Sequence, residues 1–469
     1  MPETIMTTMT TAITTTTTMM TPTTMKRTIR QLLFTTLLSL FFVSTSVGQI
    51  REQGPVGTPE IKPLPSALPE SVGMSSERLA YIDSMITSSI DAEQIPGAVA
   101  LVMRNGYLIY EKAFGIANPR SGEYLRADHI FRIASQTKAI TSTAVMILWE
   151  RGYFRLDDPV ANYIPAFKNP TVLVQFNEDD SIYTTRPAAS AITIRHLLTH
   201  TSGLGYGIID ADARMRKIYQ KAEIVDLYTT ANTSIQESVE RLAGLPLHHD
   251  PGTKFTYSEG LDVLGYLVEV VSGKPYDQFL REELFEPLGM KDTQFYLRPV
   301  QYKRLVSVQT KDASGNWVEY TGHPDGYYDA DYPKKGAKRF FGGGAGLSST
   351  AQDYARFLQM YLNGGVFNEH RILSPTTIDL IMTNQTGELF GNGKEYHGLA
   401  FGVTTPRGFA EGVRGSAGTF DWGGYFNTQY YADPELGLIG IIMKQTRLIP
   451  GEPTGQLLRQ IIAASVVEK

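Results

Sequence analysis

The sequence predicts an α/β fold in which strands from both ends of the chain form one sheet and a mainly helical segment is inserted between them. Two observations carry this prediction. Residues 98–103 and 107–114 are rich in strand-forming residues and flank Asn105-Gly106, a dipeptide typical of hairpin turns. Near the other end, residues 438–443 form an apolar run of strand length. The segments between them show mostly helical periodicity.

The predicted helices follow from apolar residues on successive turns, with capping residues before them and glycines after several of them. Ser76, Thr193 and either Ser349 or Thr350 are the expected N-caps, and Gly152 and Gly273 are expected stops. The predicted helical segments are 76–90, 135–151, 194–199, 260–272, 350–361 and 457–467.

Composition excludes several classes of function. The chain has 469 residues, enough for two lobes or domains, and its net charge of −5 gives no basic surface for nucleic acid. It has no cysteine, which excludes disulfides, thiolate metal sites and cysteine catalysis. We expect a small-molecule substrate, no nucleic-acid partner and no cofactor.

The beginning of the chain has the order of a secretory signal. Residues 1–24 are a low-complexity, Thr-rich extension, and Met25 is the expected start. A basic stretch from Lys26 to Arg30 precedes a short apolar run over 32–43 and small residues at 46–48. We therefore predict a signal peptide over 25–48, a periplasmic or secreted protein, and no stable membrane insertion after cleavage. A retained membrane anchor is the alternative interpretation.

The rest of the chain is expected to be a linker followed by one enzyme-sized unit. Residues 49–69 are rich in proline with little apolar patterning, as linkers are. Residues 70–469 then form the folded part. Within it we predict an α/β lobe from 70–150 and 340–469, and a mainly helical lobe from 151–339.

Ser135 and Lys138 are the first candidates for chemistry. They form the only Ser-x-x-Lys match in the chain, and the helical pattern begins at Ser135. One helical turn separates them, so the amine lies on the same face as the serine hydroxyl. A serine needs a base before it becomes a good nucleophile, and a lysine can be that base. The alternative is an N-cap serine with a solvated lysine beside it.

Two other patterns, a histidine pair and a glycine-rich stretch, give little support for a metal or nucleotide site. His196 and His200 stand four residues apart, as metal ligands on a helix can, but no HExxH glutamate or third ligand accompanies them. The glycine-rich stretch 342–346 lacks the Gly-Lys-Ser/Thr ending of a phosphate-binding loop. We predict no metal site, and a metallohydrolase is a distant alternative.

Three motifs in order resemble those of the serine β-lactamase and penicillin-binding-protein superfamily. They are Ser135-x-x-Lys138, Tyr257-Ser258 and Trp422-Gly423-Gly424, supported by the stretches 194–204 and 265–290. The resemblance covers about residues 70–465 and is nearest to class C β-lactamases, D-alanyl-D-alanine carboxypeptidases and family VIII carboxylesterases. It implies an antiparallel sheet flanked by helices, with an inserted mainly helical lobe.

The resemblance also implies a mechanism. Ser135 would attack a carbonyl and form an acyl-enzyme, with Lys138 and Tyr257 sharing the role of base. The backbone N–H groups of Ser135 and Tyr425 would form the oxyanion hole. The other residues implied in substrate binding are Trp422, Gly423, Gly424 and Glu259.

Two departures from the β-lactamase pattern favour an esterase. The third motif begins with Trp422 where a lysine or histidine is usual, and Glu259 stands where the second motif usually has asparagine. A cation is thus missing where a β-lactam carboxylate would bind, and Glu259 adds a negative charge there if its side chain points inward. The alternative is that Glu259 simply suits the first turn of the helix that follows. We predict a carboxylesterase acting on small esters. The alternatives are a class C-like β-lactamase or D-alanyl-D-alanine carboxypeptidase, and a catalytically inactive module that binds cell-wall peptides.

Overall fold

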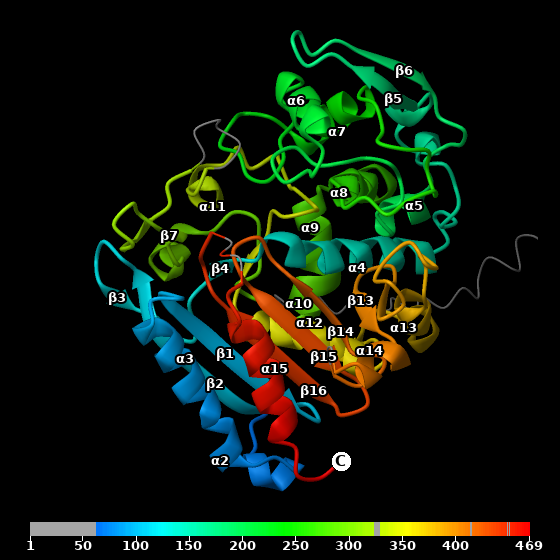
Figure 1. The fold of residues 1–469 in the computed structure, drawn as a ribbon. Helices are drawn as coiled ribbons and strands as arrows, with labels where there is room; N and C mark the ends of the chain where they lie inside the picture. The colour runs from blue at the N-terminus through cyan, green and yellow to red at the C-terminus, as the bar shows by residue number, and fades with distance from the viewer. Residues whose placement is uncertain (1–61, 323–328, 413–414, 448, 450) are drawn as a thin grey trace, which may run out of the picture. The chain divides into compact units, whose positions relative to one another are not determined.

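The computed structural model describes residues 62–322, 329–412, 415–447, 449 and 451–469. The predicted Thr-rich extension, the signal peptide and most of the linker lie outside these residues. The centre of the fold is an eight-stranded sheet in the order β12-β13-β14-β15-β16-β1-β2-β3, with every neighbouring pair antiparallel (Figure 1). Helices flank this sheet, which confirms the predicted fold class.

The strands of the main sheet come from two distant segments of the chain, as predicted. They are β1 (Gly97–Arg104), β2 (Tyr107–Asn118), β3 (Glu123–Tyr124), β12 (Glu395–His397), β13 (Gly402–Thr404), β14 (Phe420–Gly423), β15 (Gln429–Asp433) and β16 (Leu438–Met443). The hairpin between β1 and β2 turns at Asn105 and Gly106, whose φ angles of 49° and 83° suit a turn that needs positive φ at both positions. β16 pairs with β1 and so joins the two segments.

β1 is buried on both faces, which explains its unbroken apolar sequence. Ala98, Ala100 and Val102 pack into one cluster, with α2 (Ser76–Leu79), α3 (Tyr81–Asp91) and α15 (Thr454–Ala464). The alternate residues of β1 face the opposite layer, which holds α4 (Thr137–Glu150) and α12 (Ala351–Leu362). The sheet is therefore the middle of three layers (Figure 1).

α4 connects the sheet to the helices of the middle of the chain, because it packs on α8 as well. These helices are α5 (Ile194–Leu198), α6 (Ala213–Lys221), α7 (Ile235–Ala243), α8 (Gly260–Ser272), α9 (Tyr276–Leu280) and α10 (Glu286–Leu288). Short helices elsewhere are α11 (Tyr332–Lys335), α13 (Pro375–Met382) and α14 (Pro406–Ala410). Four two-stranded sheets complete the fold: β4 (Phe131–Arg132) with β9 (Ser348–Ser349), β5 (Thr171–Phe176) with β6 (Tyr183–Pro187), β7 (Gln309–Lys311) with β8 (Trp317–Glu319), and β10 (Val366–Phe367) with β11 (His370–Arg371).

The first and last predicted helices differ from the structure: the first is divided at Ala80 into α2 and α3, and the last ends at Ala464 instead of 467. The first helical segment is capped by Ser75, whose hydroxyl accepts the Arg78 amide, because Ser76 uses its own hydroxyl to contact Glu70. The last helix starts at Thr454, earlier than predicted. Its first residues have no apolar periodicity, but Thr454 is buried against Lys444.

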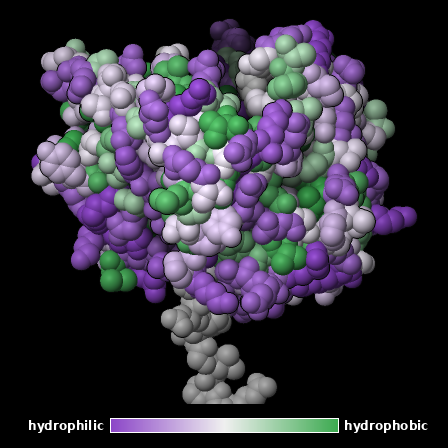
Figure 2. Space-filling view, turned by 90° about the horizontal axis from the view of Figure 1, so that it is seen from below, coloured by the Kyte–Doolittle hydropathy of each residue, from purple (hydrophilic) through white to green (hydrophobic). Residues whose placement is uncertain are grey.

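The surface shows no extended apolar face in the view of Figure 2, where hydrophobic side chains are interspersed with hydrophilic ones. Within the described ranges, no helix combines the length and apolar character needed to cross a bilayer.

Candidate active site

Ser135 lies where the sequence predicts, at the start of a helical segment. It sits in the 3-10 turn η2 (Ala134–Gln136), which continues directly into α4. Only 9% of the surface of Ser135 is exposed to solvent. The preceding Ala134 has a φ of 45°, an uncommon left-handed conformation for a residue with a side chain. Such local strain is often found at functional sites. Amide groups in the first turn of a helix have no intrahelical acceptor, so they are free to bind an anion.

Lys138 is buried, which contradicts the alternative of a solvated lysine. The residue is 4% exposed, and its Nζ lies 2.6 Å from Tyr206 Oη and 2.8 Å from the carbonyl oxygen of Gly344. Nζ also lies over two aromatic rings, 5.1 Å from the centroid of Tyr206 and 4.7 Å from that of Tyr257. The amine is therefore confined between two tyrosines and one carbonyl.

The three sequence motifs converge in the structure. The ring of Tyr257, from the second motif, lies 5.9 Å from the ring of Trp422, from the third. β14, which carries Trp422 and Gly423, contacts the turn η2 that carries Ser135. The hydroxyl of Tyr257 is buried and has no hydrogen-bond partner among the described residues. A serine, an amine and an unpaired phenol thus share one site.

Gly424 follows β14 and passes close to the segment before Ser135. A Cβ atom at position 424 would lie 2.4 Å from the carbonyl oxygen of Ile133 and 2.3 Å from Thr428 Oγ1. Position 424 therefore needs a glycine because two other segments of the same chain pack closely against it. A Cβ at Gly423 would meet nothing nearer than 3.4 Å. Tyr425 follows and packs edge-on against Phe426 at 5.2 Å.

Glu259 differs from the expectation of a negative charge beside the substrate. It stands at the N-cap of α8 and is 1% exposed, near Asp226 and Asp262. Burial, with the charges of these two aspartates, raises the pKa of Glu259 well above its usual range. Burial likewise raises the pKa of Asp262 to about 6, although the charge of Lys138 lowers it. Burial therefore favours the neutral form of the Glu259 carboxyl, so this residue gives little support for a negative charge beside the substrate.

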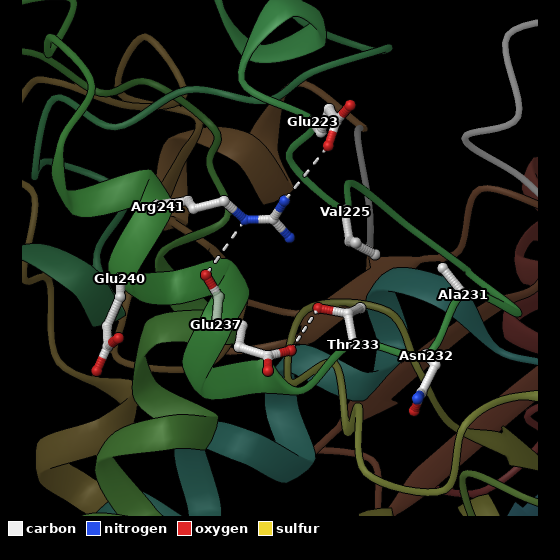
Figure 3. A pocket seen from close by; sticks show the side chains of 8 residues that line it. All are labelled: Glu223, Val225, Ala231, Asn232, Thr233, Glu237, Glu240 and Arg241. Carbon is white, nitrogen blue, oxygen red and sulfur yellow. Dashed lines mark hydrogen bonds and ion pairs between the residues drawn. The ribbon is translucent and has the colours of Figure 1, made fainter.

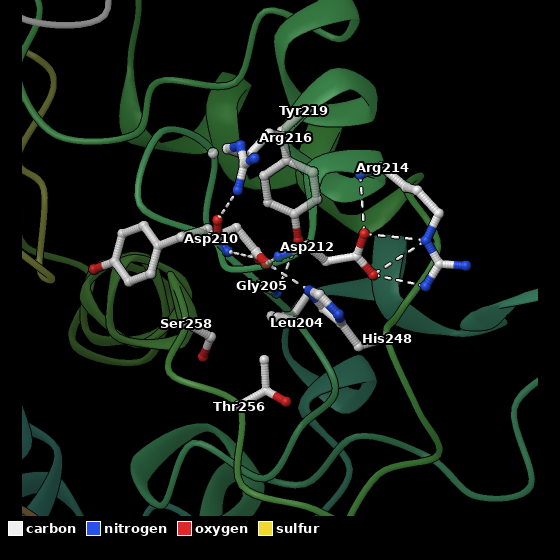
Figure 4. A network of polar contacts seen from close by, with 12 residues as sticks. Leu204, Gly205, Asp210, Asp212, Arg214, Arg216, Tyr219, His248, Thr256 and Ser258 are labelled. Atoms are coloured by element: carbon white, nitrogen blue, oxygen red, sulfur yellow. Dashed lines mark hydrogen bonds and ion pairs between the residues drawn. The ribbon is translucent and has the colours of Figure 1, made fainter. Parts of the chain in front are cut away.

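Tyr206 is a site residue that the sequence analysis missed. Its loop is anchored by polar contacts shown in Figure 4: Asp210 Oδ2 accepts from the amide of Tyr206 at 2.9 Å and lies 2.9 Å from His248 Nε2. The amide of Gly205 donates to Tyr219 Oη at 3.0 Å. Burial raises the pKa of Tyr206 well above its usual value, so it remains a neutral phenol. The loop has no periodicity that could have marked this tyrosine.

The glycine-rich stretch 342–346 supplies the other contact of Lys138. The amide of Gly344 donates to Asp262 Oδ1 at 3.2 Å, and the carbonyl of Gly343 accepts from Thr141 on α4 at 2.6 Å. A Cβ at Gly343 would lie 2.2 Å from the carbonyl oxygen of Leu261, so this stretch packs against the backbone of α8, while it meets α4 through the side chain of Thr141. The run of glycines was the sequence signal for this close approach.

His196 and His200 do not form a metal pair. His196 Nδ1 accepts from the amide of Thr193 at 3.3 Å and caps α5, while His200 Nδ1 accepts from the amide of Ser258 at 3.2 Å. In the described part of the chain, no three His, Cys, Asp or Glu side chains are grouped to hold a metal ion.

A cavity of about 710 Å³ lies elsewhere, between the loop before α7 and α7 itself (Figure 3). Arg241 there contacts Glu223 and the carbonyl of Glu237, and Thr233 donates to Glu237. None of its lining residues belongs to the three motifs, so it is separate from the candidate active site.

Comparison with known proteins shows the family of this chain. The sequence profile of the beta-lactamase family matches residues 82–462. Esterase EstB from Burkholderia gladioli is 30% identical over 387 residues, covering 78% of this chain and 90% of the esterase. Lovastatin esterase from Penicillium rubens is 31% identical over 314 residues, covering 65% of this chain and 73% of that protein. The solved structure of EstCE1, a hydrolase with promiscuous acyltransferase activity, superposes with a TM-score of 0.70 at 26% identity, covering 82% of this chain and 98% of that one.

Proposed function

The chain belongs to the beta-lactamase family and is a serine hydrolase, and we propose that it is an exported esterase that cleaves small neutral esters through an acyl-enzyme on Ser135. The observation that carries this proposal is the site itself. Lys138, one turn from Ser135, is buried, and the Tyr257 hydroxyl has no hydrogen-bond partner among the described residues. The ring of Trp422 packs near that of Tyr257, at the motif position where the resemblance to β-lactamases implies a cation.

The proposed reaction has two steps. Ser135 Oγ attacks the ester carbonyl while its proton passes to Lys138 or Tyr257, and the alcohol leaves with that proton. In the second step the same base takes a proton from a water molecule, which attacks the acyl-enzyme carbonyl. The acid is released, and the proton returns to Ser135 Oγ. Tyr206 accepts a hydrogen bond from Lys138, and burial raises its pKa, so we assign it the role of orienting the lysine. Backbone amides at Ser135 and Tyr425 would stabilise the oxyanion, a contribution typically worth about 2.7–4 kcal/mol per donor.

The charges around the site favour a neutral substrate. The candidates to replace the missing cation at Trp422 are Lys334, Lys335, Lys338 and Arg339. In the structure Lys334 and Lys335 pair with Asp331, and Arg339 pairs with Glu237, which leaves Lys338 as the candidate without an ion pair in the described residues. A substrate carboxylate beside Trp422 would compete with acidic partners for three of the four cations, and burying it unpaired costs several kcal/mol.

A substrate panel tests this proposal. We expect kcat/KM for p-nitrophenyl acetate or butyrate to exceed that for nitrocefin by at least ~100-fold, which corresponds to about 2.7 kcal/mol in the barrier. Tributyrin should also be cleaved. It is an unactivated ester, so its cleavage would show that the activity does not depend on the good p-nitrophenyl leaving group. Ser135→Ala serves as the blank for each substrate. Nitrocefin turnover that equals or exceeds ester turnover would assign the protein to the β-lactamases instead.

A further inference from the structure

His200 is a buried histidine beside the candidate active site that the proposed mechanism does not use. It follows α5, is 1% exposed, and has a φ of 55° in the left-handed region. We propose that His200 is the residue that positions Tyr257 for the reaction, an inference that rests on the esterase function proposed above.

His200 binds the main chain on both sides of Tyr257. Its carbonyl oxygen accepts from the amide of Thr256 at 2.8 Å, and its Nδ1 accepts from the amide of Ser258 at 3.2 Å. Its ring packs against the ring of Tyr257, with centroids 4.6 Å apart. One residue therefore holds the backbone before Tyr257, the backbone after it and the face of its ring.

This support decides where the phenol oxygen lies. Among the described residues, the hydroxyl of Tyr257 has no hydrogen-bond partner, so no contact at the tip of the side chain fixes it. The ring of Tyr257 packs against Lys138, Tyr206 and Trp422, and none of these contacts involves its hydroxyl. The position of the phenol oxygen in the site is therefore set by the ring packing of Tyr257 together with the backbone that His200 holds. A displacement of about 1 Å in such a group can cost ~100-fold in rate.

The contact requires a neutral imidazole with its proton on Nε2, because an amide N–H can only donate to Nδ1. The surroundings favour that form. Burial is the main cause that lowers the pKa of His200 well below its usual value, and His397 and Lys138 add to it. The nitrogen is therefore an acceptor throughout the neutral range.

Substitutions at 200 separate this role from simple packing. His200→Ala removes the acceptor and the ring, and we expect kcat for p-nitrophenyl butyrate to fall at least ~10-fold while KM changes less than ~3-fold. His200→Asn should keep kcat within ~3-fold of the native enzyme. Its Oδ1 replaces Nδ1 at the same number of bonds from the backbone, and asparagine tolerates the left-handed conformation.

His196→Ala is the matched control. It removes an imidazole acceptor one turn earlier, but one that serves the cap of α5 and not the loop of Tyr257, so kcat should stay near that of the native enzyme. A folded His200→Ala enzyme with unchanged kcat would overturn the inference, as would a folded His200→Asn enzyme slowed by ~10-fold. If His200→Ala does not fold, His200→Asn decides alone. Hydrolysis that survives Ser135→Ala would instead overturn the esterase proposal, so the two failures are distinguishable.

Discussion

Lys138 is held by neutral groups only. In the described residues it forms no ion pair, and its Nζ contacts the hydroxyl of Tyr206 and the carbonyl of Gly344. Because a carbonyl can only accept, one N–H of the amine always points to Gly344. A second N–H points to the hydroxyl of Tyr206. No carboxylate in the described residues pairs directly with the lysine, although Asp262 lies close enough for the two charges to interact.

Tyr206→Phe tests this arrangement. The change removes the hydroxyl next to Lys138 but keeps the ring, which stacks on Tyr257 at 5.4 Å. We expect kcat for ester hydrolysis to fall about 10-fold, because a hydrogen bond contributes about 0.5–1.5 kcal/mol and its loss leaves the amine less firmly oriented. KM should change little. Steady-state kinetics on p-nitrophenyl butyrate measure both values.

Tyr276→Phe is the control for that variant. Tyr276 is equally buried, and its hydroxyl bonds at 2.6 Å to Thr141 on α4, one turn beyond Lys138. We expect the Tyr276→Phe variant to have a lower free energy of unfolding than the native enzyme but an unchanged kcat. Equal kcat values for Tyr206→Phe and the native enzyme would show that Lys138 does not need this contact.

Elements with regular periodicity were predictable. The β1–β2 hairpin, α4, α5, α8 and β16 follow from local patterns, since an apolar face and a capping residue are visible in a few turns of sequence. The Ser135–Lys138 pair could be read for the same reason, because its spacing lies within one helical turn. Tyr257 and Trp422 were associated with it only through family resemblance, as no local rule brings residues so distant together.

Irregular segments were not predictable in the same way. Tyr206 and Gly344 lie in loops, and their approach to Lys138 depends on long-range packing of the loop before α6 and of the stretch before β9. The burial of Glu259 was missed for a related reason. Its position in the sequence looks like an exposed helix start, and only the packed structure shows that it is buried near two other acids.

At the scale of the whole molecule, the site depends on the pairing of the two ends of the sheet. β16 pairs with β1, and β15 and β14 follow it in order until β14 contacts the turn of Ser135. The third motif therefore reaches the nucleophile only when segments more than 300 residues apart have paired.

Export is a proposal about the whole chain and rests on the sequence alone. The order of basic, apolar and small residues from Lys26 to Gly48 predicts cleavage that leaves a mature N-terminus near Gln49. Sequencing the N-terminus of protein isolated from the native envelope measures this directly. Soluble protein that retains Met1 or Met25 would contradict the cleavage.

The most direct test of the account is covalent labelling of the nucleophile. A fluorophosphonate probe should modify the native enzyme once, at Ser135, as located by mass spectrometry of its peptides. Ser135→Ala should lose both the label and at least ~1000-fold in kcat. Ser142→Ala, at a buried serine two turns further along α4, should keep both. A label on another serine, or ester hydrolysis at the native rate in Ser135→Ala, would contradict the assignment of Ser135.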